Sequence, residues 1–147
     1  MLRLGGREAD IVSIVASLRA GSTGPHAIRD LAAEGVLRKV GWIREGVAQG
    51  GRSEDEVTIS INHWLVRVTR TPEDGADFLH RIASQSGVEP DLLAASPAVL
   101  VGTVDQLADT LVERRDRYGI SHIQLDAGMP PKNVGSLIPL VQKLAGT

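Results

Sequence analysis

The sequence predicts an α/β protein built around parallel strands, because short β-rich runs alternate along the chain with longer helical patterns. Three runs have strand character, at residues 9–15, 57–66 and 120–126. Segments with apolar residues at helical spacing separate these runs and follow the last one. The 147 residues show neither an internal linker nor a repeat beyond this recurrence. We therefore expect one domain over residues 1–147, with about three parallel βα units.

The run at 57–66 has the clearest strand pattern, because apolar and polar side chains alternate strictly over its first six residues. Its apolar set is Val57, Ile59 and Ile61, and its polar set is Thr58, Ser60 and Asn62. The first run is short and β-branched, which is typical of a buried strand. The third run follows Gly119, a residue suited to ending the preceding helix.

Helix boundaries are marked by capping residues. Thr103 and Gln106 form a capping box, in which each side chain satisfies a free backbone amide at a helix start. Thr71 is followed by a proline and opens another helix, which runs towards Gly87. These signals predict two helices between the second and third strands, with a short helical piece at residues 91–95 between them.

Glycines mark other boundaries. Residues 27–49 have helical spacing that is interrupted near Gly35, and Gly50-Gly51 ends the pattern. Gly5-Gly6 is expected to form a turn or a helix end in the same way.

Charge and composition exclude several classes of function. The chain has 16 basic and 18 acidic side chains, a net charge of -2, and so no excess positive field for nucleic acid or an anionic membrane. The absence of cysteine excludes disulfides and thiolate chemistry. The sequence shows no secretory signal and no apolar run long enough to span a bilayer. We expect a cytoplasmic protein that binds neither nucleic acid nor membranes.

Familiar chemical motifs are missing from the sequence. The four histidines are scattered without metal-ligand spacing, so no metal site is expected. The glycine-rich fingerprints of nucleotide binding and the serine elbow of hydrolases are also missing. Catalytic residues therefore stay unassigned.

Five segments together resemble a known family. They lie at residues 1–12, 40–45, 96–103, 118–123 and 144–146. In this order they are similar to the C-terminal part of the luciferase-like monooxygenase family. The resemblance implies a (β/α)8-barrel oxidoreductase that acts on a small molecule, with reduced flavin mononucleotide (FMN) or a deazaflavin coenzyme as its cofactor.

The chain is short for that family, since a complete barrel has roughly 250 residues. The family's first five strands, and the glycine-rich segment that helps to hold the cofactor phosphate, have no counterpart in this sequence. Three strands leave two open sheet edges, which favour pairing with another chain. We expect a partial, TIM-barrel-like fold that is completed by oligomerisation, either with further copies or with a partner that supplies strands.

Side chains on the second and third strands are the candidates for a pocket lining. If the apolar residues face outer helices, the alternate side chains point towards the barrel axis. With one residue of the first strand, they give the candidate set Ser13, Asn62, Trp64, Gln124 and Asp126. Trp64 is expected to form an apolar wall and the others to hydrogen-bond. The alternative is that these side chains satisfy one another or face solvent.

Two functions remain open. The first is a luciferase-like oxidoreductase or monooxygenase that uses reduced flavin or deazaflavin. The second is a catalytically silent, truncated barrel fragment that acts as an oligomerisation or interaction module and binds no cofactor.

Overall fold

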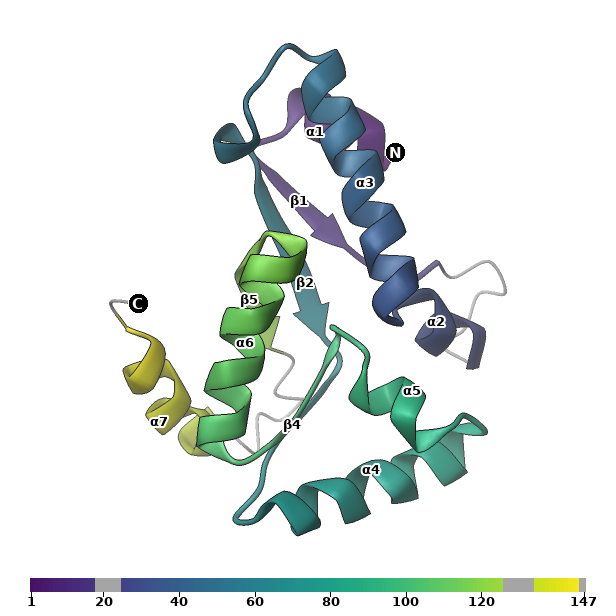
Figure 1. Ribbon diagram of the computed structural model, residues 1–147, viewed down its shortest axis with the longest axis vertical. Helices are drawn as coiled ribbons and strands as arrows, with labels where there is room; N and C mark the ends of the chain where they lie inside the picture. The colour runs from purple at the N-terminus through teal and green to yellow at the C-terminus, as the bar shows by residue number, and fades with distance from the viewer. Residues whose placement is uncertain (18–24, 126–133, 146–147) are drawn as a thin grey trace.

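The computed structural model describes residues 1–17, 25–125 and 134–145 of the chain (Figure 1). The helices are α1 (Leu2–Glu8), α2 (Pro25–Asp30), α3 (Ala33–Gln49), α4 (Pro72–Ser86), α5 (Pro90–Ala94), α6 (Val104–Tyr118) and α7 (Val134–Leu144), with a 3-10 turn η1 at Glu54–Glu56. The strands are β1 (Ile11–Ile14), β2 (Thr58–His63), β3 (Leu65–Val68), β4 (Val99–Gly102) and β5 (Ile120–Leu125). The chain is α/β, as the sequence predicts.

Three parallel strands form the main sheet, in the order β1-β2-β5. They fall within the three runs that the sequence identifies, so the prediction of three parallel strands is confirmed. Strands β3 and β4 pair in parallel as a second, small sheet. The small sheet and its helices α4 and α5 lie at the lower end of the molecule in Figure 1.

The expectation of one strand over residues 57–66 is wrong. Strand β2 ends at His63, the chain bends at Trp64, and β3 then joins the small sheet. The side chain of His63 is fully buried and contacts α6, whereas Leu65 pairs with Val99 of β4. The residues on both sides of the bend favour a strand, and nothing in the pattern of apolar and polar side chains marks where one strand ends and the next begins.

Strand β4 is a further element that the sequence patterns did not predict. It is four residues long and lies between Pro97 and Thr103, the residue that caps α6. Four residues are too few to show the alternation of apolar and polar side chains that identifies a strand. The segment becomes a strand by pairing with β3, and its Val99 side chain is buried in the core.

Helices cover one face of the main sheet. Helices α3 and α6 lie on the same side of it (Figure 1). The core on this side joins apolar residues of β1, of β2 and of the position just before β2 to the buried stripe of α3, namely Val12, Ile14, Val57, Ile59, Ile61, Val36, Val40, Ile43 and Val47. The expectation that the apolar set of the second strand faces helices is confirmed.

The capping predictions are also confirmed. Thr103 Oγ1 accepts a hydrogen bond from the backbone of Gln106 at 3.3 Å, and the Gln106 side chain accepts one from the backbone of Thr103 at 3.0 Å. Helix α4 ends at Gly87 and α6 ends at Gly119, with φ angles of 63° and 71°. Glycine adopts this left-handed conformation without the strain that a side chain would cause.

The expectation for Gly5 and Gly6 is wrong, because both lie inside α1. Helix α1 packs against α3 with its backbone in direct contact. A Cβ atom at Gly6 would collide with the carbonyl oxygen of Ile43, and one at Gly46 with the carbonyl oxygen of Arg3. Close packing of the two backbones therefore outweighs the low helix propensity of glycine here.

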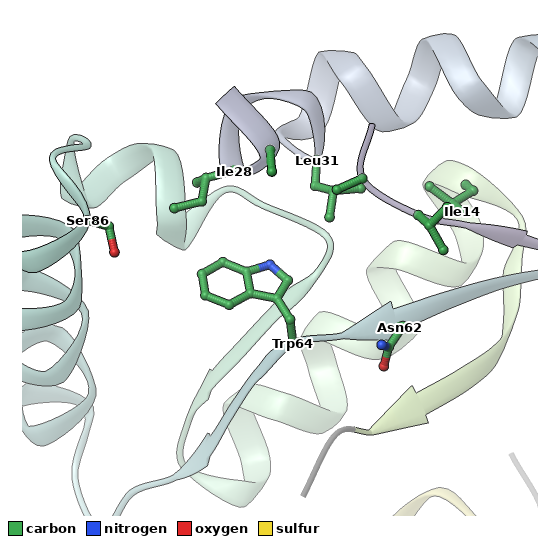
Figure 2. A pocket seen from close by; sticks show the side chains of 9 residues that line it. Ile14, Ile28, Leu31, Asn62, Trp64 and Ser86 are labelled. Atoms are coloured by element: carbon green, nitrogen blue, oxygen red, sulfur yellow. The ribbon is translucent and has the colours of Figure 1, made fainter. Parts of the chain in front are cut away.

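The helical pattern over residues 27–49 is divided into α2 and α3 at Leu31 and Ala32, slightly before the expected interruption near Gly35. Gly35 lies so close to the Asp30 carbonyl that a Cβ atom would collide with it. The tight corner places α2 beside the carboxyl end of β1 (Figure 2).

Candidate functional site

The face of the main sheet opposite α3 carries polar side chains. Paired residues of parallel strands share a face, so Ser13, Ser60 and His122 form one row, and Asn62 and Gln124 form the next. Asn62, His122 and Gln124 are exposed, whereas Ser60 is fully buried. We call this surface the open face.

A pocket of about 630 Å³ lies where β1 and β2 end. Figure 2 shows the indole of Trp64 between the end of β2 and the side chains of Ile28 and Leu31, with Ser86 of α4 across the space. The volume falls within the range of small-molecule sites. We call it the Trp64 pocket, and its lining residues are Ile14, Val15, Ala16, Ala27, Ile28, Leu31, Asn62, Trp64 and Ser86.

The bend between the two sheets places Trp64 in this pocket. The side chain packs against the core beneath α3 and also against the core that joins β4 to α4 and α5. A continuous strand would instead keep the indole in the alternation of the main sheet. The break that the sequence patterns missed is therefore the feature that builds the apolar wall.

A buried polar cluster holds the bend from the side of α6. The Arg114 guanidinium donates hydrogen bonds to the carbonyl oxygens of Ser96 and Pro97, each at 3.1 Å. Its Nη1 atom also lies 3.3 Å from Nε2 of His63. One side chain thus connects the end of β2 to the segment that leads into β4.

The protonation states of this cluster follow from burial. Burial, and secondly the charge of Arg114, lower the pKa of His63 to about 4, so the imidazole is neutral at neutral pH and accepts at Nε2. Burial lowers the pKa of Arg114 to about 10, which leaves it charged. Within the described residues Nδ1 of His63 has no hydrogen-bond partner of normal geometry. The nearby backbone of Gln124 favours the protonated imidazole and raises the pKa of His63, but by less than burial and Arg114 lower it.

A partly buried ion pair fixes the α2 wall of the pocket. The carboxylate of Asp30, the last residue of α2, accepts the backbone N–H of Ser17 at 2.7 Å and also binds the buried Lys39 ammonium of α3. Burial raises the pKa of Asp30, but these hydrogen bonds and the charge of Lys39 outweigh it and hold the pKa below its ordinary value. The pair anchors the exit of β1 to α2.

The structure places the predicted candidates in different positions. Asn62 and Trp64 line the Trp64 pocket. Ser13 and Gln124 lie on the open face and are not part of the pocket lining. Asp126 lies outside the described residues. That these side chains contact a ligand stays a prediction.

Two features of the site were not among the predicted candidates. One is the hydrogen-bonded pair on the open face, in which Nδ1 of His122 lies 3.1 Å from Oγ of Ser60. Alternation with Ile123 and Leu125 does place His122 on the face of Ser60, so the sequence carries a signal for this pair, although it does not reveal the register shift after Ile120. The other is the apolar wall from Ile28 and Leu31, for which no local pattern indicates proximity to β2.

Over residues 1–17, 25–125 and 134–145, no three His, Asp or Glu side chains are grouped so as to hold a metal ion. No helix in these ranges is both long and apolar enough to cross a membrane.

Comparison with known proteins finds no matching family model and no matching curated protein. Solved structures do match. Long-chain alkane monooxygenase LadA matches 98% of this chain at 14% identity with a TM-score of 0.62. Riboflavin lyase, solved with modified FMN and riboflavin, matches 98% at 12% identity with a TM-score of 0.57. The coenzyme F420-dependent tetrahydromethanopterin reductase of Methanopyrus kandleri matches 96% at 20% identity with a TM-score of 0.56.

These likenesses define the fold. The chain spans less than half of each of these larger proteins, namely 38%, 41% and 46% of their lengths. A parallel α/β arrangement that covers this share is consistent with a partial TIM-barrel-like fold. Enzymes that use FMN or coenzyme F420 occur among the neighbours, so the fold agrees with the luciferase-like resemblance of the sequence.

Proposed function

We propose that this chain forms part of a luciferase-like oxidoreductase that uses FMN or a deazaflavin such as coenzyme F420. The observation that carries the proposal is the position of the Trp64 pocket, at the carboxyl ends of β1 and β2. Enzymes with TIM-barrel folds place their active sites at this end of the strands. The similarity to flavin- and F420-dependent enzymes supports the same assignment.

The pocket residues fit the apolar part of a ligand. Trp64 offers a flat aromatic surface for a ring or an alkyl group, and the Asn62 amide offers hydrogen bonds at the rim. The nine lining residues include no cation, so they supply no partner for the phosphate of FMN. In this proposal the ring system of the cofactor lies against Trp64 with the substrate beside it, and other groups hold the phosphate. When bound, reduced FMN would supply electrons to the reaction, whereas a deazaflavin would donate or accept a hydride.

We further propose that the site is completed by another copy of this chain. Strands β1 and β5 are the two edges of the described main sheet. Ile11 on β1 and Val15 just beyond it are 56% and 59% exposed. Apolar side chains at an unpaired strand edge favour pairing with an added strand.

The test is a titration of the purified chain with FMN and with coenzyme F420, each oxidised and reduced, combined with its mass in solution. We expect saturable binding of one cofactor by an oligomer. Failure of both cofactors to bind would contradict the enzyme proposal.

The alternative is a silent interaction module that binds no cofactor. The exposed apolar residues Val134, Ile138 and Val141 favour it, because their spacing places them on one side of α7. A stable oligomer without cofactor binding would support this alternative, whereas tight binding of either cofactor would exclude it.

A further inference from the structure

An irregularity in β5 turns His122 onto the open face. Ile59 of β2 pairs with Ile120, but the next residue, Ser60, pairs with His122, so Ser121 is an extra residue in β5. In a regular pairing Ser121 would oppose Ser60, and His122 would fall on the helix-covered face. A bulge is rare in a parallel pair, and bulges in general are over-represented beside active sites, where they redirect a side chain.

The redirected imidazole is held by a buried partner. Nδ1 of His122 lies 3.1 Å from Oγ of Ser60, which is fully buried, while His122 itself is exposed. A ring held at Nδ1 directs its second nitrogen, Nε2, away from Ser60. The arrangement orients the imidazole for a hydrogen bond with another molecule.

The surroundings of His122 are polar but uncharged. Its neighbours on the open face are Ser13 in the same row and Asn62 and Gln124 in the next. Apart from His122 itself, none of the described strand residues on this face is acidic or basic. Such a surface matches a neutral hydrogen-bonding group better than a carboxylate or a phosphate, for which the strands offer no counter-charge.

Asn62 connects this row to the Trp64 pocket. It lines the pocket, and it follows Ser60 by two residues on the same face, a rise of about 7 Å along the strand. An elongated molecule with its apolar part beside Trp64 would therefore pass Asn62 on its way to His122.

We propose that Ser60 and His122 form the polar end of a ligand site whose apolar end is the Trp64 pocket. The site takes an uncharged, amphipathic organic molecule, with a carbonyl or hydroxyl oxygen hydrogen-bonded to Nε2 of His122. This inference rests on one part of the proposed function, namely that the Trp64 pocket binds a ligand. It does not require that a flavin binds.

The experiment compares three probes of similar shape: 4-phenyl-2-butanone, butylbenzene and 3-phenylpropanoate. Binding is followed by nuclear magnetic resonance of the Trp64 indole N–H in a Trp42→Phe variant, which leaves a single tryptophan. We expect the ketone to bind at least about threefold more tightly than the hydrocarbon or the anion, as one neutral hydrogen bond provides. The ketone alone should also shift the imidazole nitrogen signals of His122.

A conservative variant separates binding from folding. His122→Asn keeps an amide that can bond to Ser60 but removes Nε2, so it should weaken ketone binding about fivefold and leave butylbenzene unaffected. His80→Asn, at an exposed position of α4, is the matched control and should change neither. Three results would overturn the inference. They are equal affinity for the ketone and the hydrocarbon, no binding of the ketone, and an equal loss of affinity for both probes in His122→Asn. These outcomes are independent of the cofactor titration, which tests the proposed function separately.

Discussion

Nη1 of Arg114 lies 3.3 Å from Nε2 of His63, and both side chains are buried where the main sheet gives way to the small sheet. The contact joins a charged donor on α6 to a neutral acceptor at the end of β2. It holds the bend at Trp64 and therefore the wall of the pocket.

His63 should make the stability of the protein depend on pH. Its pKa is about 4 in the folded chain and about 6.5 in the unfolded chain, so the unfolded state binds more protons between these values. The stabilisation is complete above pH 6.5 and is lost as the pH falls towards 4, by up to about 3 kcal/mol. Urea unfolding of the wild type, His63→Gln and His80→Gln at pH 7.5 and pH 5 measures this loss. The free energy of unfolding should fall between the two pH values in the wild type and in His80→Gln, and it should fall less in His63→Gln. An equal fall in all three proteins would contradict this account.

Arg114→Lys should destabilise the fold although it conserves the charge. The planar guanidinium of Arg114 donates hydrogen bonds to the carbonyls of Ser96 and Pro97 and to His63 at the same time, and a lysine ammonium cannot reproduce this geometry. Leaving buried acceptors unpaired costs about 2 to 4 kcal/mol, measurable by denaturant unfolding. Arg117→Lys on the same helix is the control, because its exposed pairing with Glu113 contributes little. Equal effects of the two substitutions would refute the role assigned to Arg114.

Gly46→Ala should separate α1 from α3, because the added Cβ atom would collide with the carbonyl oxygen of Arg3. We expect a loss of at least about 2 kcal/mol from overpacking. Gly41→Ala lies on the same helix, where nothing is within 4 Å of the added atom, and should stabilise the protein by about 0.5 to 1 kcal/mol. Thermal unfolding of both variants provides the measurement, and stabilisation of both would show that the helices do not require this close contact.

Some elements could be predicted from the sequence because local chemistry determines them. The capping box at Thr103 and Gln106 acts within one helical turn, and the alternation over residues 57–62 reports directly which side chains face the core. Both features are present in the structure as expected.

Other elements depend on contacts between distant segments. The helical state of Gly5 and Gly6 follows from the backbone of α3, and the bend at Trp64 follows from the pairing of β3 with β4 and from Arg114. The same holds for the pocket, since Ile28 meets Trp64 only after α2 has packed beside β1. Local periodicity carries no signal for these encounters.

Ile11→Lys should reduce the mass of the assembly if copies pair through the edge of β1. The side chain is 56% exposed at that edge, and a lysine there opposes pairing with an added strand without disturbing the core. Leu37→Lys is the control, at a 41% exposed position on α3 and outside the strand. Light scattering after size-exclusion chromatography should give a smaller species for Ile11→Lys alone. A monomeric wild type, or an unchanged mass in this variant, would contradict the proposed edge pairing.

The central claim, that the Trp64 pocket belongs to a flavin- or deazaflavin-dependent site, is tested most directly by cofactor titration of two tryptophan variants. Trp64→Leu removes the aromatic wall, whereas Trp42→Leu alters a ring that lies beside Arg3 and Arg38 and outside the pocket lining. We expect the wild type and Trp42→Leu to bind FMN or coenzyme F420 with equal affinity, and Trp64→Leu to bind roughly tenfold more weakly because an aromatic contact is lost. Absence of binding by the wild type, or equal affinity in all three proteins, would contradict the claim.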